Sequence, residues 1–367
     1  MTINQENKTK STAEMILLWA KENNLFRRDS TEQAVDFEEE EGTQVSNRAF
    51  NAAETIAIFR KRSVNYVVYD ELNSIVTVFT SGRLTKGEIK SIPFKTENDV
   101  TINYAHGGAP LVRPATGSSH TKPVWHKDGV VACGSSIHPI IECGAGTFGA
   151  LVKDQNGTIF GLTNNHVSGG CNYSTPDVPI VCPGPLDACE TKIDPFTIGR
   201  HTKLLTITDG LPENVDISNN YDAALFKITE TNRVSSSQAF KFDTPSKVES
   251  PHGLMKVEKY GRTTGHTIGK VIGQYATPID VHYSYGNFRK AVYFSDAWVI
   301  NGENNEPFSE PGDSGSLVVG TNSGGERVAV GLVFAGNPQT GQTFVLPLKP
   351  MLDRLGVELL SGHNAEI

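Results

Sequence analysis

A serine at position 314 stands in a segment whose composition suits a nucleophile. Gly312 and Gly315 flank Asp313-Ser314, and an apolar run follows at residues 317–319. Glycines permit a tight turn and let the carbonyl group of a substrate approach the backbone. The N–H groups of Gly312 and Ser314 could then converge on one oxygen and form an oxyanion hole. The same pattern also occurs in ordinary polar loops, so the hypothesis needs support from other residues.

A serine hydroxyl is a weak nucleophile at neutral pH, so it needs a base and a group that orients the base. His166 is the candidate base because it directly follows a β-type run that ends at residue 163. Asp222 is the candidate orienting carboxylate, since the apolar run 223–228 follows it directly. Asp216 competes for this role, but no apolar strand follows it, and we favour Asp222.

These three residues fall in a part of the chain that we expect to be mostly β. From about residue 143, short apolar runs alternate with turns rich in Gly, Pro, Asn and Asp. Evenly spaced strands without intervening helical patterns are typical of a sandwich or a barrel rather than of a βαβ fold. We expect strands at 148–153, 159–163, 223–228, 256–260, 291–299, 316–319, 328–334 and 343–346, and one last helix at 349–355.

Residues 1–107 are predicted to form a separate α+β unit. The spacing of apolar residues predicts helices at about 12–24 and 46–61, capped by Thr12 and Ser46. A β-hairpin at 64–80, a short helix at 85–89 and a strand at 100–104 follow. The acidic run 36–42 is expected to be a solvated loop. Turn-forming residues then favour a connection at 108–142, the main domain at 143–360 and a tail at 361–367.

The composition excludes several other functions and locations. With 33 Lys+Arg against 41 Asp+Glu, the net charge of −8 does not favour a nucleic-acid partner. No apolar run of about 18 residues predicts a membrane span, and no export signal is evident. The 5 cysteines form no CxxC pair, which indicates reduced thiols in a cytoplasm rather than disulfides or a metal site.

The order His166, Asp222, Ser314 resembles that of chymotrypsin-like serine proteases. Thr-Asn-Asn-His-Val at 163–167, Asp-Ala-Ala-Leu at 222–225 and Gly-Asp-Ser-Gly at 312–315 match that family. They look most like its bacterial trypsin-like branch and its HtrA-type members, here without a PDZ-like extension. The resemblance spans roughly residues 140–357.

This resemblance implies a fold and a role for each site residue. The implied fold is a chymotrypsin-like double β-barrel, preceded here by the N-terminal α+β unit. Ser314 would be the nucleophile, His166 the general base and acid, and Asp222 its orienting partner. The N–H groups of Gly312 and Ser314 would form the oxyanion hole, and no metal or cofactor is implied.

The substrate side of the predicted site departs from the family. The run 331–336 matches the strand that lines the pocket and pairs with the substrate backbone. At Phe334 the family usually has a serine that hydrogen-bonds the catalytic aspartate, so either another donor replaces it or Asp222 is less well held. At Phe308, the expected pocket base, members that cleave after Arg or Lys have an aspartate. We therefore expect a preference for small or apolar side chains, although nearby Glu310 could restore recognition of a basic one. The candidate substrate-binding residues are Phe308, Phe334, Ala335 and Gly336.

The sequence thus predicts an intracellular serine endopeptidase that acts on a protein or peptide through an acyl-enzyme. Regulation is expected through residues 1–107 or a protein partner bound there, without a membrane partner. No Ile-Val-like start indicates a cleaved N-terminus that would pair with Asp313, so no such activation switch is expected. An alternative is a catalytically silent binding or adaptor module with a protease fold. In a further alternative, residues 1–107 form an adaptor or sensor and the protease is its effector.

Overall fold

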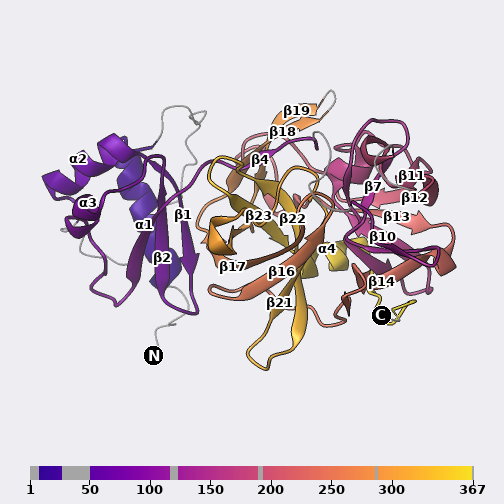
Figure 1. The fold of residues 1–367 in the computed structure, drawn as a ribbon. Coiled ribbons are helices and arrows are strands. Elements are labelled where there is room, and N and C mark those ends of the chain that lie inside the picture. The colour runs from indigo at the N-terminus through magenta and orange to yellow at the C-terminus, as the bar shows by residue number, and fades with distance from the viewer. Residues whose placement is uncertain (1–7, 27–49, 116–122, 189–192, 286–287, 366–367) are drawn as a thin grey trace.

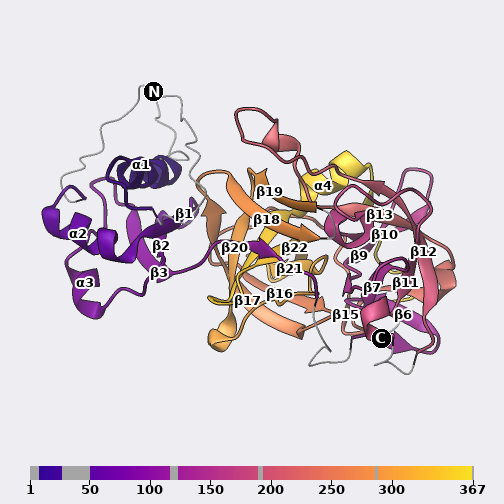
Figure 2. The same cartoon turned by 90° about the horizontal axis from the view of Figure 1, so that it is seen from above.

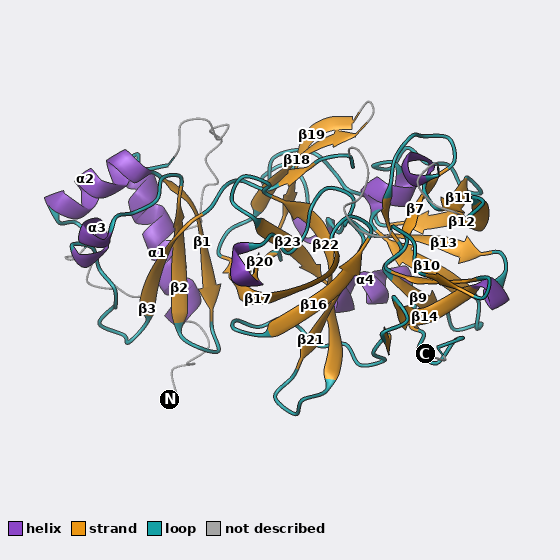
Figure 3. Ribbon diagram, viewed as in Figure 1, coloured by secondary structure: helices purple, strands orange, loops and turns teal. Residues whose placement is uncertain are grey.

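The computed structural model describes residues 8–26, 50–115, 123–188, 193–285 and 288–365. Three units lie in a row, and Figure 1 shows the N-terminal unit at one end and two β-rich units beyond it. Helices gather in the N-terminal unit, whereas strands build most of the other two (Figure 3). Within those ranges, no helix is both long enough and apolar enough to cross a bilayer.

The N-terminal unit packs helices against a small sheet. β1 (Val64–Asp70) and β2 (Ile75–Thr80) form an antiparallel hairpin, and β3 (Thr101–His106) runs parallel to β2. Helix α1 (Lys8–Glu22) covers the sheet, as Figure 2 shows. The hairpin and the order of the elements agree with the sequence analysis. The remaining helices are α2 (Ala53–Arg62) and α3 (Lys86–Lys90).

The hydrophobic core of this unit is formed by apolar residues that recur along its helices and strands. Trp19 of α1 and Phe59 of α2 meet edge to face, with ring centroids 5.5 Å apart. Thr85 caps α3 through a capping box with Glu88, which explains the short helix at the expected place. Helix α2 begins later than the sequence suggested. Ser46 and the acidic run 36–42 lie outside the described residues.

The first β-unit is an open barrel built from two sheets. Its larger sheet has the order β24-β9-β10-β13-β12-β11-β7-β8, and a smaller sheet has the order β15-β14-β6-β5. Phe148 and Phe226 fill its centre and are fully buried. The strands are β5 (His126–Lys127), β6 (Val130–Cys133), β7 (Ser136–Pro139), β8 (Gly146–Thr147), β9 (Ala150–Lys153), β10 (Ile159–Thr163), β11 (Pro179–Cys182), β12 (Phe196–Leu204), β13 (Ala224–Ile228), β14 (Val234–Gln238), β15 (Phe242–Asp243) and β24 (Glu358–Leu359).

The second β-unit is a closed barrel. Its strands pair in the cycle β16-β17-β20-β23-β22-β21 and back to β16. The hairpin of β18 and β19 and the short strand β4 (Leu111–Val112) lie beside it, while α4 (Leu348–Leu355) packs against β22. The strands are β16 (Lys256–Gly261), β17 (Gly265–Tyr275), β18 (Ile279–Tyr285), β19 (Phe288–Phe294), β20 (Trp298–Gly302), β21 (Leu317–Thr321), β22 (Arg327–Gly336) and β23 (Gln342–Pro347).

The N-terminal unit extends the sheet of the closed barrel. β1 pairs with β17 through Val68 opposite Tyr275 and Tyr69 opposite Gln274. Tyr66 stacks between Phe79 and Tyr275, with centroid distances of 4.4 and 4.7 Å. This apolar stack joins the two units.

The connection expected at residues 108–142 is shorter in the structure. Strands β5, β6 and β7 lie within that range and belong to the open barrel, and β4 belongs to the sheet of the closed one. These strands are only two to four residues long, so their apolar pattern is too short to reveal them. The tail is also packed, because the N–H of Ser236 donates to the carbonyl of His363 over 2.9 Å.

Candidate active site

His166, Asp222 and Ser314 come from three segments that meet where the barrels join. His166 lies in a single π-helical turn (Asn165–Gly169) that directly follows β10. Asp222 lies two residues before β13, and Ser314 lies on the turn that leads into β21. Because β10 and β13 pair with each other, their ends bring His166 and Asp222 together. Ser314 comes from the closed barrel and borders the same cavity as His166.

The His166–Asp222 pair has the geometry of a base and its orienting carboxylate. The ring atom Nδ1 of His166 lies 2.5 Å from Oδ2 of Asp222. The backbone N–H of His166 donates to Oδ1 over 3.0 Å. Asp222 is completely buried and the His166 side chain is 6 % exposed. This arrangement fixes Nδ1–H toward the carboxylate and leaves Nε2 as the proton acceptor.

Tyr283 supplies a third hydrogen bond to the buried carboxylate. Its hydroxyl donates to Oδ2 of Asp222 over 2.8 Å, from the middle of β18. Burial, and then the nearby charge of Asp222, raise the pKa of Tyr283 well above its ordinary value, so the hydroxyl keeps its proton. Phe334 instead packs against Phe294, at 5.0 Å between centroids. Tyr283 is therefore a donor to Asp222 where the residue at position 334 supplies none.

The backbone around Ser314 forms the tight turn that the glycines suggested. Gly312 has φ +105° and Gly315 has φ +92°, which L-residues with a Cβ rarely adopt. The carbonyl of Ser314 accepts the N–H of Thr147 over 2.9 Å, and the N–H of Gly315 donates to Val333 over 2.9 Å. Within the described residues, the N–H groups of Gly312 and Ser314 donate to no other protein group. Their role as an oxyanion hole stays a prediction.

Asp313 anchors this turn inside the closed barrel. Its Oδ1 accepts the N–H groups of Thr263 and Thr264 over 2.7 and 3.1 Å. The ammonium of Lys259, on β16, lies 3.3 Å from Oδ2, and both side chains are completely buried. Burial lowers the pKa of Lys259, and the carboxylate of Asp313 opposes that change. The positive partner of Asp313 is thus a residue of the barrel wall.

A second buried ion pair holds the open barrel to the same turn. Arg262 donates through Nε to Asp187 over 2.7 Å, and both side chains are completely buried. The backbone N–H of Arg262 donates to the hydroxyl of Thr147 over 3.0 Å. That hydroxyl in turn donates to the carbonyl of Gly312 over 2.9 Å. The orientation of the peptide at Gly312 therefore depends on contacts across the barrel junction.

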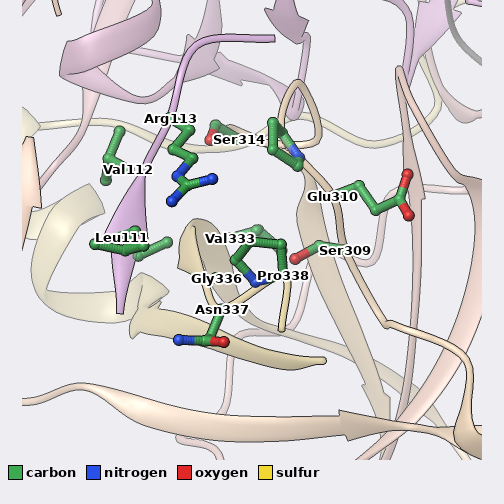
Figure 4. Close-up of a pocket in the computed structure, with 12 residues that line it drawn as sticks. Leu111, Val112, Arg113, Ser309, Glu310, Ser314, Val333, Gly336, Asn337 and Pro338 are labelled. Carbon is green, nitrogen blue, oxygen red and sulfur yellow. The ribbon is translucent and has the colours of Figure 1, made fainter. Parts of the chain in front are cut away.

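Two cavities meet at Ser314. The larger, of about 150 Å³, is bordered by His166, Ser314 and Gly312. The smaller, of about 30 Å³, is bordered by Ser314, Ser309, Glu310, Ala335 and Gly336. Ala335 and Gly336 therefore lie where the sequence suggested a substrate site, and Figure 4 shows the second cavity.

Phe308 and Phe334 do not border these cavities. Both side chains are completely buried. Phe308 packs in a core cluster with Val271 and Ile300, which lie on strands of the closed barrel. The structure thus corrects their assignment as substrate-binding residues, because Phe308 fills the core of the closed barrel and Phe334 packs against Phe294 of β19.

His138, which was not among the predicted site residues, borders the larger cavity. It lies on β7 and is only 4 % exposed. Burial, and to a smaller extent the nearby His166, lower its pKa to about 4. No sequence signal marks this residue, since the strand that carries it has only four residues.

The thiols and acidic groups of the described residues suggest no metal centre. Cys133, Cys171 and Cys182 are buried thiols, and burial raises the pKa of each. Among the residues that the structure describes, no group of three or more His, Cys, Asp or Glu side chains has a metal-binding arrangement. Cys189 lies outside them.

Comparison with known proteins places these features in a wider context. A family model described as the Nal1 C-terminal domain matches residues 214–351. The rice protein NARROW LEAF 1 (Oryza sativa subsp. japonica) is 25% identical over 297 residues, which cover 72% of this chain and 48% of that protein. The chain spans about half the length of this curated relative. The bacterial branch suggested by the motifs remains a prediction.

Solved serine proteases are similar in fold. Thermobifida fusca protease A has a TM-score of 0.42 and 16% identity, covering 63% of this chain and 100% of its own. A glutamic acid specific serine protease has a TM-score of 0.43 and 17% identity, with coverage of 63% and 100%. Cellulomonas bogoriensis chymotrypsin has a TM-score of 0.39 and 16% identity, with coverage of 63% and 98%. The mostly β chain has a chymotrypsin-like double β-barrel with an N-terminal α+β unit.

The Lys259–Asp313 pair gives a prediction about stability. Replacing Lys259 with Met should lower the free energy of unfolding by about 3–5 kcal/mol, because it leaves a buried carboxylate without its counter-ion. The double variant Lys259→Met/Asp313→Asn should recover most of this loss. Urea denaturation of the three proteins measures the difference. Equal stabilities of the single and double variants would contradict the ion-pair explanation.

His138 gives a prediction about pH. Its pKa is about 4 in the folded chain against an ordinary 6.5, so between these values the unfolded chain binds more protons. The free energy of unfolding should therefore fall as the pH falls from about 6.5 to about 4, by roughly 3 kcal/mol in total from this residue. His138→Gln should lose that part of the acid sensitivity. Denaturation at pH 7 and pH 4.5 tests this, and identical pH profiles would count against it.

Proposed function

We propose that this protein is a serine endopeptidase that cleaves a protein or peptide substrate through an acyl-enzyme. The observation that carries the proposal is the buried His166–Asp222 pair, at 2.5 Å, on the rim of a cavity that Ser314 and Gly312 also border. Base, orienting carboxylate, nucleophile and oxyanion donors therefore serve one site. No step of this chemistry requires a metal or a cofactor.

Acylation follows from the proton path. Nε2 of His166 takes the proton of the Ser314 hydroxyl while Oγ bonds to the substrate carbonyl carbon. The tetrahedral intermediate carries its negative charge on the former carbonyl oxygen, where the N–H groups of Gly312 and Ser314 can stabilise it. The C–N bond then breaks, and the leaving amine receives the proton from His166. An ester between Ser314 and the acyl group remains.

Deacylation repeats these steps with water. His166 removes a proton from the water molecule as its oxygen attacks the ester carbonyl. Collapse of the second intermediate breaks the bond to Ser314, which recovers the proton from His166. The carboxylate of Asp222 stabilises the imidazolium. Tyr283 and the N–H of His166 keep that carboxylate in position.

The preference for a small or apolar side chain at the cleavage site remains a prediction from the sequence. The cavity bordered by Ala335 and Gly336 has a volume of about 30 Å³, but the side chain of Arg113 already extends into it, so this volume does not measure the room for a substrate side chain. Glu310 borders it too, but its carboxylate extends away from the cavity centre in Figure 4. We further propose a cytoplasmic enzyme with a regulatory protein partner at the N-terminal unit. The silent binding module remains the alternative, and the next two experiments separate them.

Ser314 should be the residue that reacts with a fluorophosphonate probe. We expect the full-length chain to become labelled and Ser314→Ala to remain unlabelled, because only an activated hydroxyl attacks the phosphorus. Ser316→Ala is a matched control, since its hydroxyl donates to the carbonyl of Asp313 over 2.6 Å and does not face the cavity. A folded chain that is never labelled would favour the silent module.

Tyr283 should act as a positioning residue for Asp222. Tyr283→Phe removes a hydrogen bond to a buried charged group, worth roughly 1.5–3 kcal/mol, so kcat/KM should fall about 10- to 100-fold. The pH of half-maximal kcat/KM on the acidic limb should also move, since Asp222 is then less well compensated beside His166. Tyr173→Phe, at a site 70% exposed, is the control. An unchanged rate and pH profile would remove Tyr283 from the mechanism.

A further inference from the structure

One segment of this chain lies in the groove that leads to Ser314. β4, which consists of Leu111 and Val112, is inserted between β18 and β22. Leu111 pairs antiparallel with Gly336 of β22. On its other side β4 runs parallel to β18, with Leu111 opposite His282 and Val112 opposite Tyr283. The segment therefore occupies an extended position between the two strands that border the groove.

The residues after β4 continue past the reacting groups. Val112 and Arg113 border both cavities together with Ser314. In Figure 4 the side chain of Arg113 lies beside Ser314 and extends into the smaller cavity. Further along, a Cβ placed on Gly312 would lie 3.2 Å from Cβ of Ala115. Residues 111–115 thus extend from β22 to the turn that contains Gly312 and Ser314.

Polar contacts hold the start of this segment on the closed barrel. The side-chain amide of Asn337 donates to the carbonyl of Ala109 over 2.7 Å. The N–H of Gly108 donates to the hydroxyl of Thr340 over 3.2 Å. A Cβ on Gly108 would come too close to Nδ2 of Asn337, so a larger residue here would have to displace that side chain. Both partners lie on the loop between β22 and β23.

The hold on residues 111–115 is weak enough to be reversible. Val112 is 3 % exposed, but Leu111 and Ala115 are only partly buried, and Arg113 and Pro114 are exposed. Burial of a single valine changes an equilibrium by roughly 10- to 100-fold. Such a segment can leave the groove without unfolding either barrel.

An extended peptide is bound most simply by adding a strand to an unpaired sheet edge. With β4 in place, the sides of these strands that face the groove are paired at Gly336 of β22 and at His282 and Tyr283 of β18. We infer that residues 111–115 act as an intramolecular inhibitor, which occupies the peptide position beside Ser314 until it is displaced. This rests on the proposed function only in naming the groove as a substrate site. The occupancy itself can be measured without catalysis.

Peptide binding in a Ser314→Ala background tests the occupancy. The probe is a fluorescent peptide with the sequence of residues 108–115, Gly-Ala-Pro-Leu-Val-Arg-Pro-Ala. Leu111→Pro removes the N–H that Leu111 can offer to its neighbours, so the segment should leave and the peptide should bind at least about 10-fold more tightly by fluorescence anisotropy. Val112→Asp should have the same effect, and a thermal melt checks that each variant is folded. Leu72→Asp, at the exposed tip of the β1–β2 hairpin, is the charge-matched control.

Equal dissociation constants in the folded variants and the parent chain would overturn the inference. With Ser314 restored, Leu111→Pro should also react with the fluorophosphonate about 10-fold faster than the wild type. Tighter peptide binding without any labelling would contradict the proposed function, but it would still support the inference that residues 111–115 occupy the groove. Cleavage of the wild-type chain between Arg113 and Pro114, detected as a mass change, would contradict the inhibitor, because the segment would then be a substrate.

Discussion

The carboxylate of Asp222 is completely buried, so its charge must be balanced by hydrogen bonds that the fold brings to it. The donors come from two different places. His166 contributes its ring and its backbone N–H from the turn after β10, and Tyr283 contributes its hydroxyl from β18. The open barrel and the hairpin beside the closed barrel are therefore fixed relative to each other around one ion. The same hairpin borders the groove, so the orientation of the base and the shape of the groove are linked.

The turn at Ser314 is held by a comparable device on the other side of the site. Asp313 has its counter-ion in Lys259, and Asp187 has its counter-ion in Arg262, all with completely buried side chains. Such pairs contribute little net stability compared with apolar residues, but removal of one partner is costly. Their value here is geometric, because both pairs lie next to the turn whose N–H groups would stabilise the oxyanion in the proposed mechanism. Lys259 belongs to β16, so the conformation of the turn at Ser314 depends on a residue in the wall of the closed barrel.

The sequence allowed the prediction of features that depend on local pattern. The strands with several apolar residues, such as β10 and β22, lie near the expected ranges, and the glycines around Ser314 have the backbone conformation that their type suggested. The His166–Asp222 contact followed from motif order. Tyr283 could not be assigned to the site from the sequence, because nothing local shows which distant carboxylate a hydroxyl will reach. Phe308 was placed in the pocket by motif alignment, whereas core packing placed it in the barrel interior.

The position of residues 111–115 in the groove also could not be predicted from their own sequence, because it depends on residues far away in the chain. Two residues carry no periodicity, and β4 exists only because β18 and β22 lie on either side of it. Its position also connects the groove to the N-terminal unit. Gly107, just before the segment, packs so closely on Tyr66 and Phe79 that a Cβ would collide with the ring of Phe79. Tyr66 also stacks on Tyr275 of β17, so the contact that docks the N-terminal unit is the contact that fixes the start of the segment. A partner that displaced the N-terminal unit from its contact with β17 would therefore also displace the residues beside Ser314.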